Sequence, residues 1–126
     1  MNIRSLELED VEEIRRIHEK FFEGEFEFPD FLNNFLCSFV VKKDKDIVVA
    51  GGVRMLAEAI LITDKEYPII ERRKALHQAL DACAFITKRA DFSQLHAFVK
   101  GDNWIRHLGK VGFSPTKGHA LVLDLR

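Results

Sequence analysis

Three consecutive basic residues, Arg72, Arg73 and Lys74, fall within the first two turns of a helix that the sequence predicts over residues 68–89. The dipole of a helix disfavours cations near its first turn, so a basic run at this place is easier to understand if an anion lies against it. Arginine presents a planar fork of donors that suits phosphate oxygens. The run therefore indicates an anion-binding site. The alternative is a solvated basic face that nearby glutamates balance.

The other reactive side chains lack the spacings of common catalytic or metal centres. Cys37 and Cys83 stand alone in apolar stretches, which excludes a zinc knuckle or a redox pair, and both are expected to be small buried thiols. No metal-ligand spacing links His96 and His119, the two histidines on predicted strands. The chain has neither a Gly-x-Ser-x-Gly turn nor a Walker loop. We therefore expect no metal centre and no serine nucleophile.

Two predicted strands flank the long helix and would position its basic start. Residues 58–63 are rich in β-branched side chains, and apolar and polar residues alternate over 94–99. The helix between them has an apolar stripe that includes Leu76, Leu80 and Cys83. Because a strand–helix–strand crossover joins parallel strands, the sequence predicts one parallel pairing within a mainly antiparallel sheet.

The N-terminal half predicts a strand, a helix and a hairpin. Residues 3–6 form the strand, and an apolar stripe over residues 11–21 predicts the helix. A charged turn joins two further strands at 38–42 and 47–53. The adjacent glycines in the second of these, Gly51–Gly52, predict a bulge or a close approach of two backbones.

Seven of the eleven phenylalanines lie within residues 21–39, where Pro29 and Asp30 could open a short helix that runs to about Leu36. These rings could cap the core beneath a helix–loop–helix. They could also wall an apolar substrate pocket, because ring-rich loops over a sheet form concave sites. Both interpretations stay open.

The C-terminal part predicts a turn at residues 101–103 that caps a short helix over 104–111, which Gly112 ends. Alternating residues over 119–125 predict a last strand. The whole pattern predicts a single α+β domain over residues 1–126. Its mixed, mainly antiparallel sheet would have helices on both faces.

Charge and hydropathy exclude several classes of protein. Lys and Arg number 19 against 20 Asp and Glu, for a net charge of −1, so no bulk positive field exists to hold nucleic acid or an anionic membrane. No window has the roughly 18 consecutive apolar residues of a membrane span, and the first residues lack the apolar centre of a signal peptide. We therefore expect a cytoplasmic protein that contacts neither nucleic acid nor membrane.

The order of these elements resembles the GNAT superfamily of acyl-CoA-dependent N-acyltransferases. The strand at Ile3–Arg4 runs into an acidic helix start over residues 9–14, a central strand leads directly into the long helix, and a later helix ends in Lys110-x-Gly112-Phe113 before the final strand. The resemblance spans essentially the whole chain. Members encoded by phages are similarly short and glycine-poor.

The resemblance implies a fold, a cofactor and a site. The cofactor would be acetyl-CoA, bound in a wedge of the sheet beside the long helix, and the acceptor a small-molecule or peptide amine. Glu58 would act as the general base, and His107 could transfer a proton. The cofactor would be held by Ile62 and by the basic run Arg72, Arg73 and Lys74.

Two features of the family are missing from this sequence. No glycine occurs between Gly52 and Gly101, so the glycine-rich loop that holds the pyrophosphate in the family is absent. The position of the family's tyrosine proton donor corresponds to Leu108. The alternative function is therefore a catalytically inactive GNAT-fold module for binding or assembly, whose signature would be an exposed apolar patch or a stable homodimer.

Overall fold

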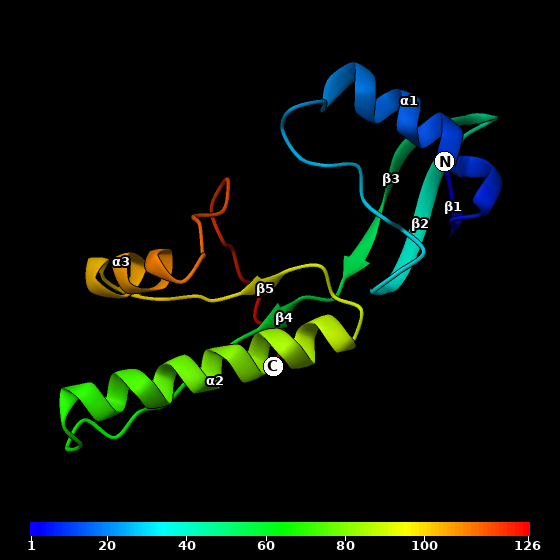
Figure 1. The fold of residues 1–126 in the computed structure, drawn as a ribbon. Helices are drawn as coiled ribbons and strands as arrows, with labels where there is room; N and C mark the ends of the chain where they lie inside the picture. The colour runs from blue at the N-terminus through cyan, green and yellow to red at the C-terminus, as the bar shows by residue number, and fades with distance from the viewer. The chain divides into compact units, whose positions relative to one another are not determined.

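The structure, a computed structural model, describes all 126 residues as five strands, three α-helices and one short 3-10 helix (Figure 1). The chain is α+β, as the sequence predicts. It divides into two compact units, Met1–His96 and Ala97–Arg126, and each is described by itself.

Three antiparallel strands form the larger sheet of the first unit. They are β1 (Asn2–Ser5), β2 (Phe35–Lys43) and β3 (Asp46–Arg54), in the order β1-β2-β3. The predicted opening strand and hairpin are thereby confirmed, although β2 begins three residues before the predicted start. Only two residues turn the chain between β2 and β3, and the first of them, Asp44, has a positive φ of 56°. Aspartate tolerates this left-handed conformation better than most residues, which suits a tight hairpin.

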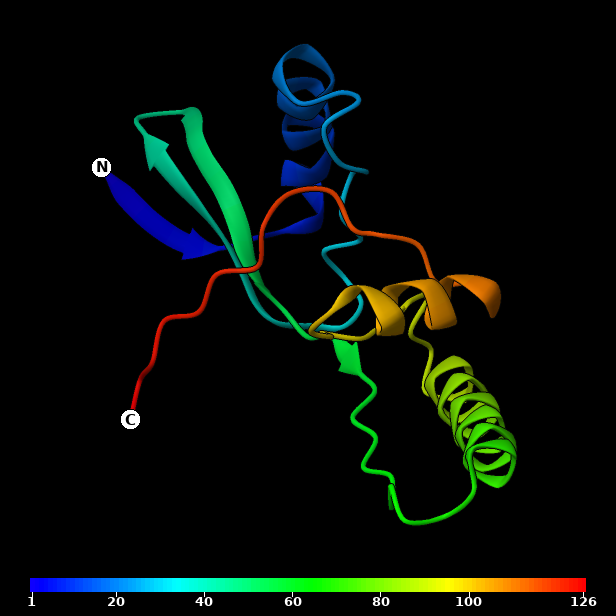
Figure 2. The same ribbon diagram turned by 90° about the vertical axis from the view of Figure 1, so that its left-hand side faces the viewer.

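The core of this unit lies between one face of the sheet and the first helix. A 3-10 turn (Leu8–Asp10) leads into α1 (Val11–Phe21), whose apolar stripe confirms the predicted helix. Ile14 of α1 packs with Phe31 and with Val40 of β2, which has no exposed surface. Figure 2 shows α1 beside this face of the three strands.

The opposite face of the same sheet is apolar and has no helix against it, and we call it the outer face; Phe39 and Val41 on its central strand are half-buried. Ile3, Val41 and Val49 form one row across the strands, and Phe39 and Gly51 pair in the next. Ile3 is 63% exposed and Val49 51% exposed. Helices were expected on both faces of the sheet, but for these three strands the structure provides one on the inner face alone.

Cys37 and Gly52 lie on adjacent strands near the open end of the hairpin, away from its turn. Cys37 pairs with Val53 and is exposed, so the expectation of a buried thiol was wrong there, while Cys83 is half-buried. A β-carbon on Gly52 would overlap the carbonyl oxygen of Cys37 and lie 2.8 Å from the α-carbon of Ser38. The close backbone approach predicted at the two glycines is confirmed at Gly52. The bulges lie elsewhere, between Phe35 and Cys37 and opposite the step from Val41 to Lys42.

The predicted helix over residues 29–36 was wrong. Leu32 N–H and the Asn33 side chain both donate to the carboxylate of Asp30, at 3.2 and 2.6 Å, and these local bonds favour a turn over a helix. The rings of this segment pack in sequence on one another: Phe31 lies 5.7 Å from Phe28 and 5.3 Å from Phe35 between ring centroids. For these three rings, packing on the core is the interpretation that the contacts favour.

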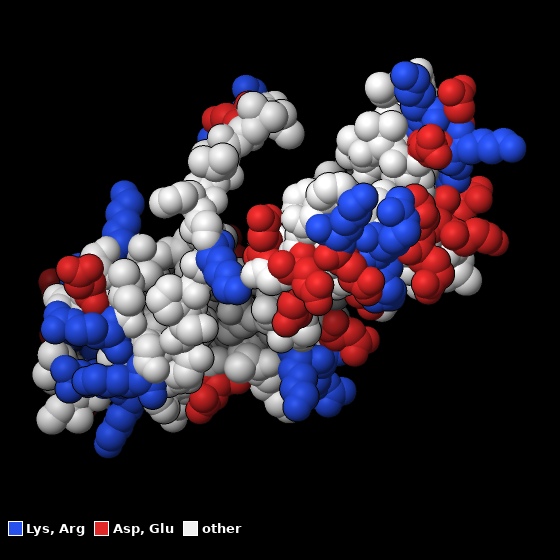
Figure 3. Space-filling view, turned by 90° about the horizontal axis from the view of Figure 1, so that it is seen from above, with Lys and Arg blue, Asp and Glu red and all other residues white.

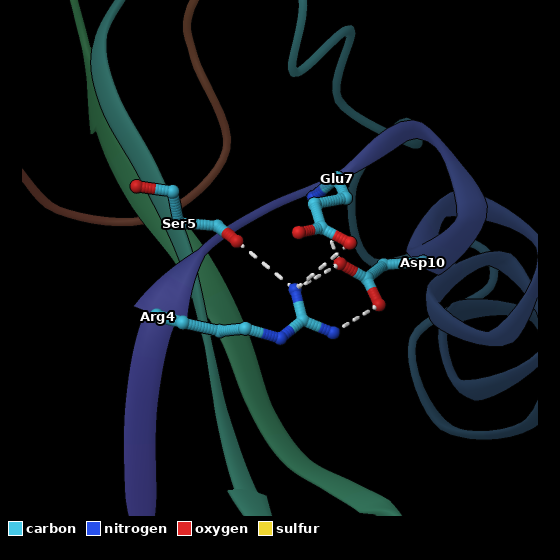
Figure 4. Close-up of polar contacts among 4 residues, drawn as sticks. All are labelled: Arg4, Ser5, Glu7 and Asp10. Atoms are coloured by element: carbon cyan, nitrogen blue, oxygen red, sulfur yellow. Dashed lines mark hydrogen bonds and ion pairs between the residues drawn. The ribbon is translucent and has the colours of Figure 1, made fainter.

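An ion pair fixes the start of α1 to the first strand (Figure 4). Arg4 donates two hydrogen bonds to the Asp10 carboxylate, at 2.7 and 2.8 Å, and the backbone N–H of Glu7 donates a third at 2.8 Å. Asp10 is only 7% exposed. These donors, the Arg4 guanidinium first, lower the pKa of Asp10 from 3.8 to about 2, although burial acts in the opposite direction.

We expect acid to remove the stabilisation that this pair supplies. Because the pKa of Asp10 is lower in the folded chain, the contribution is complete above the ordinary value of 3.8 and is lost as the pH falls through about 2. Arg4 is partly exposed, so we expect a loss of about 1–2 kcal/mol. Urea unfolding of wild type and Asp10→Asn between pH 6 and pH 2 measures it. The difference in unfolding free energy should shrink toward pH 2, and a difference that is constant with pH would contradict this origin.

The second half of the first unit contains the crossover. Two short strands, β4 (Ala57–Glu58) and β5 (Leu95–His96), pair in parallel, and α2 (Ile69–Arg89) lies between them in the chain and packs against β5. The parallel pairing and the long helix confirm the sequence prediction. The strands are two residues long instead of six, and they form a separate sheet. A two-stranded ladder with no further neighbour is only marginally stable, which fits its shortness.

The C-terminal unit contains one helix, α3 (Asp102–Lys110). Gly101, with a φ of 87°, is its N-cap, and Gly112, with a φ of 106°, follows its end as predicted. The predicted last strand was wrong: residues 119–125 form no strand, and Leu121 is 95% exposed. An alternating segment becomes a strand only where a neighbouring strand accepts its hydrogen bonds, and none pairs with this one.

Candidate functional site

The crossover brings Glu58 next to a histidine. Glu58 ends β4, and its register partner in the parallel pair is His96, the last residue of β5. Register partners project from the same face of a sheet. Glu58 is exposed, whereas the Nδ1 atom of His96 is buried and has no hydrogen-bond partner. A carboxylate beside an imidazole at the end of two strands is an arrangement that can accept and pass on a proton.

The ladder of β4 and β5 stops at this pair. The last hydrogen bond in this direction runs from the N–H of Ala59 to the carbonyl oxygen of His96, at 2.8 Å. Residues 59–64 and 97–100 then continue without strand structure. Glu58 therefore stands where the two strands stop pairing, so its carboxylate is open to solvent.

The basic run begins in the first turn of α2, but its three side chains have different environments. Arg72 is half-buried and lies on the inward stripe with Leu76 and Leu80, and its Nε atom is buried without a hydrogen-bond partner. Arg73 and Lys74 are exposed, since successive helical residues point about 100° apart. None of the three forms an ion pair in the structure. Of the three, Arg72 is therefore the one with a buried N–H donor that has no acceptor.

The beginning of α2 offers backbone donors as well. Pro68 is its N-cap, and no side chain caps the helix. The first backbone hydrogen bond of the helix runs from the N–H of Arg72 to the carbonyl oxygen of Pro68, at 3.0 Å. The N–H groups of residues 69–71 precede that bond, so no carbonyl of the helix accepts from them. Free amides and partial positive charge make such an end suitable for an anion.

Two other predicted site residues have environments of their own. Ile62 lies between β4 and α2 and is 96% exposed. His107 lies in α3 of the second unit, half-buried, with its ring 6.0 Å from that of Trp104 in an edge-on arrangement. This contact favours a packing role for His107. The next residue, Leu108, is buried, so a side chain at the tyrosine position of the family would point inward.

Sequence reasoning did not single out the pairing of Glu58 with His96. The signal for it was present in the crossover, because a parallel pairing of the two flanking strands fixes which residues are neighbours, but it does not fix the register. The ion pair of Arg4 and Asp10 was missed as well. In the sequence, an acid at the start of a helix is equally consistent with a simple interaction with the helix dipole.

Charge on the surface is mixed. Over α1, acidic and basic side chains lie side by side on the face that Figure 3 draws. No group of three or more His, Cys, Asp or Glu side chains lies close enough together to hold a metal ion. A helix that spans a membrane needs roughly 20 mainly apolar residues, and no helix of this chain satisfies that requirement.

Comparison with known proteins identifies no relative: no family model, curated protein or solved structure matches this chain.

Proposed function

We propose that this protein is an acyl-CoA-dependent N-acetyltransferase that transfers an acetyl group to an amine. The observation that carries the proposal is the parallel pair β4–β5, which stops at Glu58 and His96 and is joined by α2. The resemblance to the GNAT superfamily implies such an opening as the place of the cofactor. We include in this proposal that the strands are arranged as in the GNAT fold.

The start of α2 offers hydrogen-bond donors that could bind the diphosphate part of acetyl-CoA. The buried Nε of Arg72 lacks an acceptor, and the amides of residues 69–71 point out of the helix end. Arg73 and Lys74 are exposed nearby and add positive charge. These side chains would take the place of the missing glycine loop, since charge-assisted hydrogen bonds from arginine bind phosphate oxygens strongly.

Glu58 would accept the proton of the acceptor amine, either directly or through water, with His96 beside it. Bound acetyl-CoA supplies a thioester carbonyl as the acyl donor. Ile62, which is 96% exposed, would contact the apolar arm of the cofactor. The acceptor would be a small molecule or a peptide, and the reaction would take place in the cytoplasm, where free thiols such as Cys37 and Cys83 persist.

Acetyl-CoA at 1 mM is expected to stabilise the protein against heat, because a ligand that binds the folded state alone raises its stability. With a dissociation constant of about 100 µM, the gain is about 1.4 kcal/mol, or a rise in melting temperature of about 3–6 °C. The Arg72→Gln variant should lose most of this rise. Arg73→Gln is the comparison variant: it removes the same charge from an exposed neighbouring position and should lose less of the rise.

No shift for the wild-type protein at millimolar acetyl-CoA would contradict the proposal. Equal losses in the two arginine variants would contradict the assigned role of Arg72. Acetylation of an amine panel tests the chemistry separately: we expect Glu58→Gln to lower kcat/KM about 100-fold or more, while the cofactor shift remains.

A catalytically inactive binding or assembly module is the second candidate. Two observations favour it: buried Leu108 lies where the family places a tyrosine proton donor, and the outer face of the sheet is apolar and exposed. Absence of turnover with every amine, together with normal acetyl-CoA binding, would support the module. Turnover that depends on Glu58 would exclude it.

A further inference from the structure

We propose that the outer face of the three-stranded sheet is the interface of a homodimer, in which Phe39 of each copy sits over Gly51 of the partner subunit. The inference does not rest on the acetyltransferase proposal. It follows from the composition, exposure and register of β1, β2 and β3 alone.

The outer face has no charged side chain in three successive paired rows. Its residues, read from the register, are Ile3, Ser5, Cys37, Phe39, Val41, Val49, Gly51 and Val53. Ile3 is 63% exposed, and Val49 and Val53 are each 51% exposed. Packing these side chains against a partner surface would remove apolar area from water, which favours association.

The face is complementary to itself. Phe39 of β2 and Gly51 of β3 are direct cross-strand neighbours, so a large ring stands next to a position that has no side chain. A β-carbon added to Gly51 would have no atom within 4 Å, which means that the space above it is open. Phe39 is half-buried on the central strand, β2. Each copy therefore presents an aromatic ring and an open space side by side.

A two-fold axis parallel to the strands and between β2 and β3 matches the two features. Such an axis exchanges the two strands of the facing copies, so each Phe39 lies over the Gly51 of the partner subunit. Sheets that pack face to face in this way are the ordinary solution for two apolar sheet surfaces, and a two-fold interface uses the same patch on both copies.

The size of the face sets the expected strength. From ordinary strand spacing and rise it measures roughly 14 Å by 20 Å. That is less than the roughly 800 Å² per partner of a stable complex, so we expect a dissociation constant of about 10–100 µM. Since no like charges face one another, association should change little with salt.

Sedimentation equilibrium of the full chain from about 5 to 500 µM tests the proposal, a range that brackets the expected dissociation constant. Val49→Lys introduces a charge into the apolar face and should raise the dissociation constant about 10-fold or more. Gly51→Val fills the hollow and should have a similar effect. Because its β-carbon meets no atom within 4 Å and valine favours strands, Gly51→Val should leave the melting temperature of the monomer unchanged or higher.

Leu32→Lys is the matched control, since Leu32 is apolar and 68% exposed but lies outside the sheet. It should leave the dissociation constant unchanged within about two-fold. A wild-type chain that stays monomeric throughout the range overturns the proposal, because some other part of the chain would then cover the face. A dimer that Val49→Lys and Gly51→Val leave intact also overturns it, since its interface would lie elsewhere, as in residues 119–125.

Discussion

Replacing Gly52 by alanine is expected to lower the free energy of unfolding by about 2–4 kcal/mol, the range of a substitution that forces a packed backbone apart. The new methyl group would overlap the carbonyl oxygen of Cys37 and lie 2.8 Å from the α-carbon of Ser38. Both are backbone atoms of β2, which cannot move without breaking the hairpin ladder. Urea or thermal unfolding followed by circular dichroism measures the change.

Gly51→Ala is the matched control for this substitution. It places the same methyl group on the neighbouring residue of the same strand, where no atom lies within 4 Å. Alanine also restricts the unfolded chain, so we expect a change between zero and about 1 kcal/mol in favour of the folded state. If the two variants unfold alike, the close approach at Gly52 has no energetic importance.

Removing the Asp10 carboxylate is the second large change that we expect. Asp10→Ala removes the acceptor of the Glu7 N–H and of two Arg4 hydrogen bonds, so Arg4 keeps only its 3.0 Å bond to the carbonyl oxygen of Ser5. Asp10 is 7% exposed, so water replaces the carboxylate poorly. The expected loss is about 2–3 kcal/mol, the usual cost of a buried donor left without its partner.

Glu13→Ala supplies the comparison. Glu13 also accepts two hydrogen bonds from one arginine, Arg16, but these side chains are 45% and 59% exposed. A pair on the surface contributes little, so we expect less than about 0.5 kcal/mol. Chemical unfolding at pH 7 measures both variants. A loss for Asp10→Ala no larger than that for Glu13→Ala would contradict the structural importance of the buried pair.

The elements that the sequence predicted well are those whose own residues carry the whole signal. The apolar stripe of α1 and that of α2 repeat at helical spacing, and the hairpin of β2 and β3 has apolar strands on either side of a charged turn. The parallel pairing of β4 with β5 followed from the strand–helix–strand order, because a crossover through a helix joins parallel strands. In each case local chemistry and connection length leave few other solutions.

The elements that were wrong depend on partners that a sequence does not reveal. A strand over residues 119–125 needs a neighbour to take its hydrogen bonds, and β4 and β5 stop after two residues for the same reason. Pro29 and Asp30 could open a helix, yet Leu32 N–H and the Asn33 side chain both donate to the Asp30 carboxylate and close a local turn instead. Whether a side chain forms such local hydrogen bonds or the backbone continues as a helix depends on the three-dimensional structure.

The candidate site was predictable in part. The position of the basic run at the start of α2 follows from the sequence, but the burial of Arg72, as opposed to Arg73 and Lys74, depends on which face of α2 turns inward. Likewise Glu58 was singled out by resemblance, while its neighbour His96 follows from the strand register. The sequence therefore predicted where these residues lie along the chain, but not which of them are buried or which residues they neighbour.

The short turn between β2 and β3 has a kinetic consequence. Two residues separate these strands, so bringing them together restricts the chain very little, whereas β4 and β5 meet only after the 36 residues from 59 to 94 have been enclosed. The entropic cost of closing a loop grows with its length, and contacts between distant residues form late. The hairpin is therefore the natural nucleus for folding, and the neighbourhood of Glu58 and His96 assembles on a scaffold that already exists.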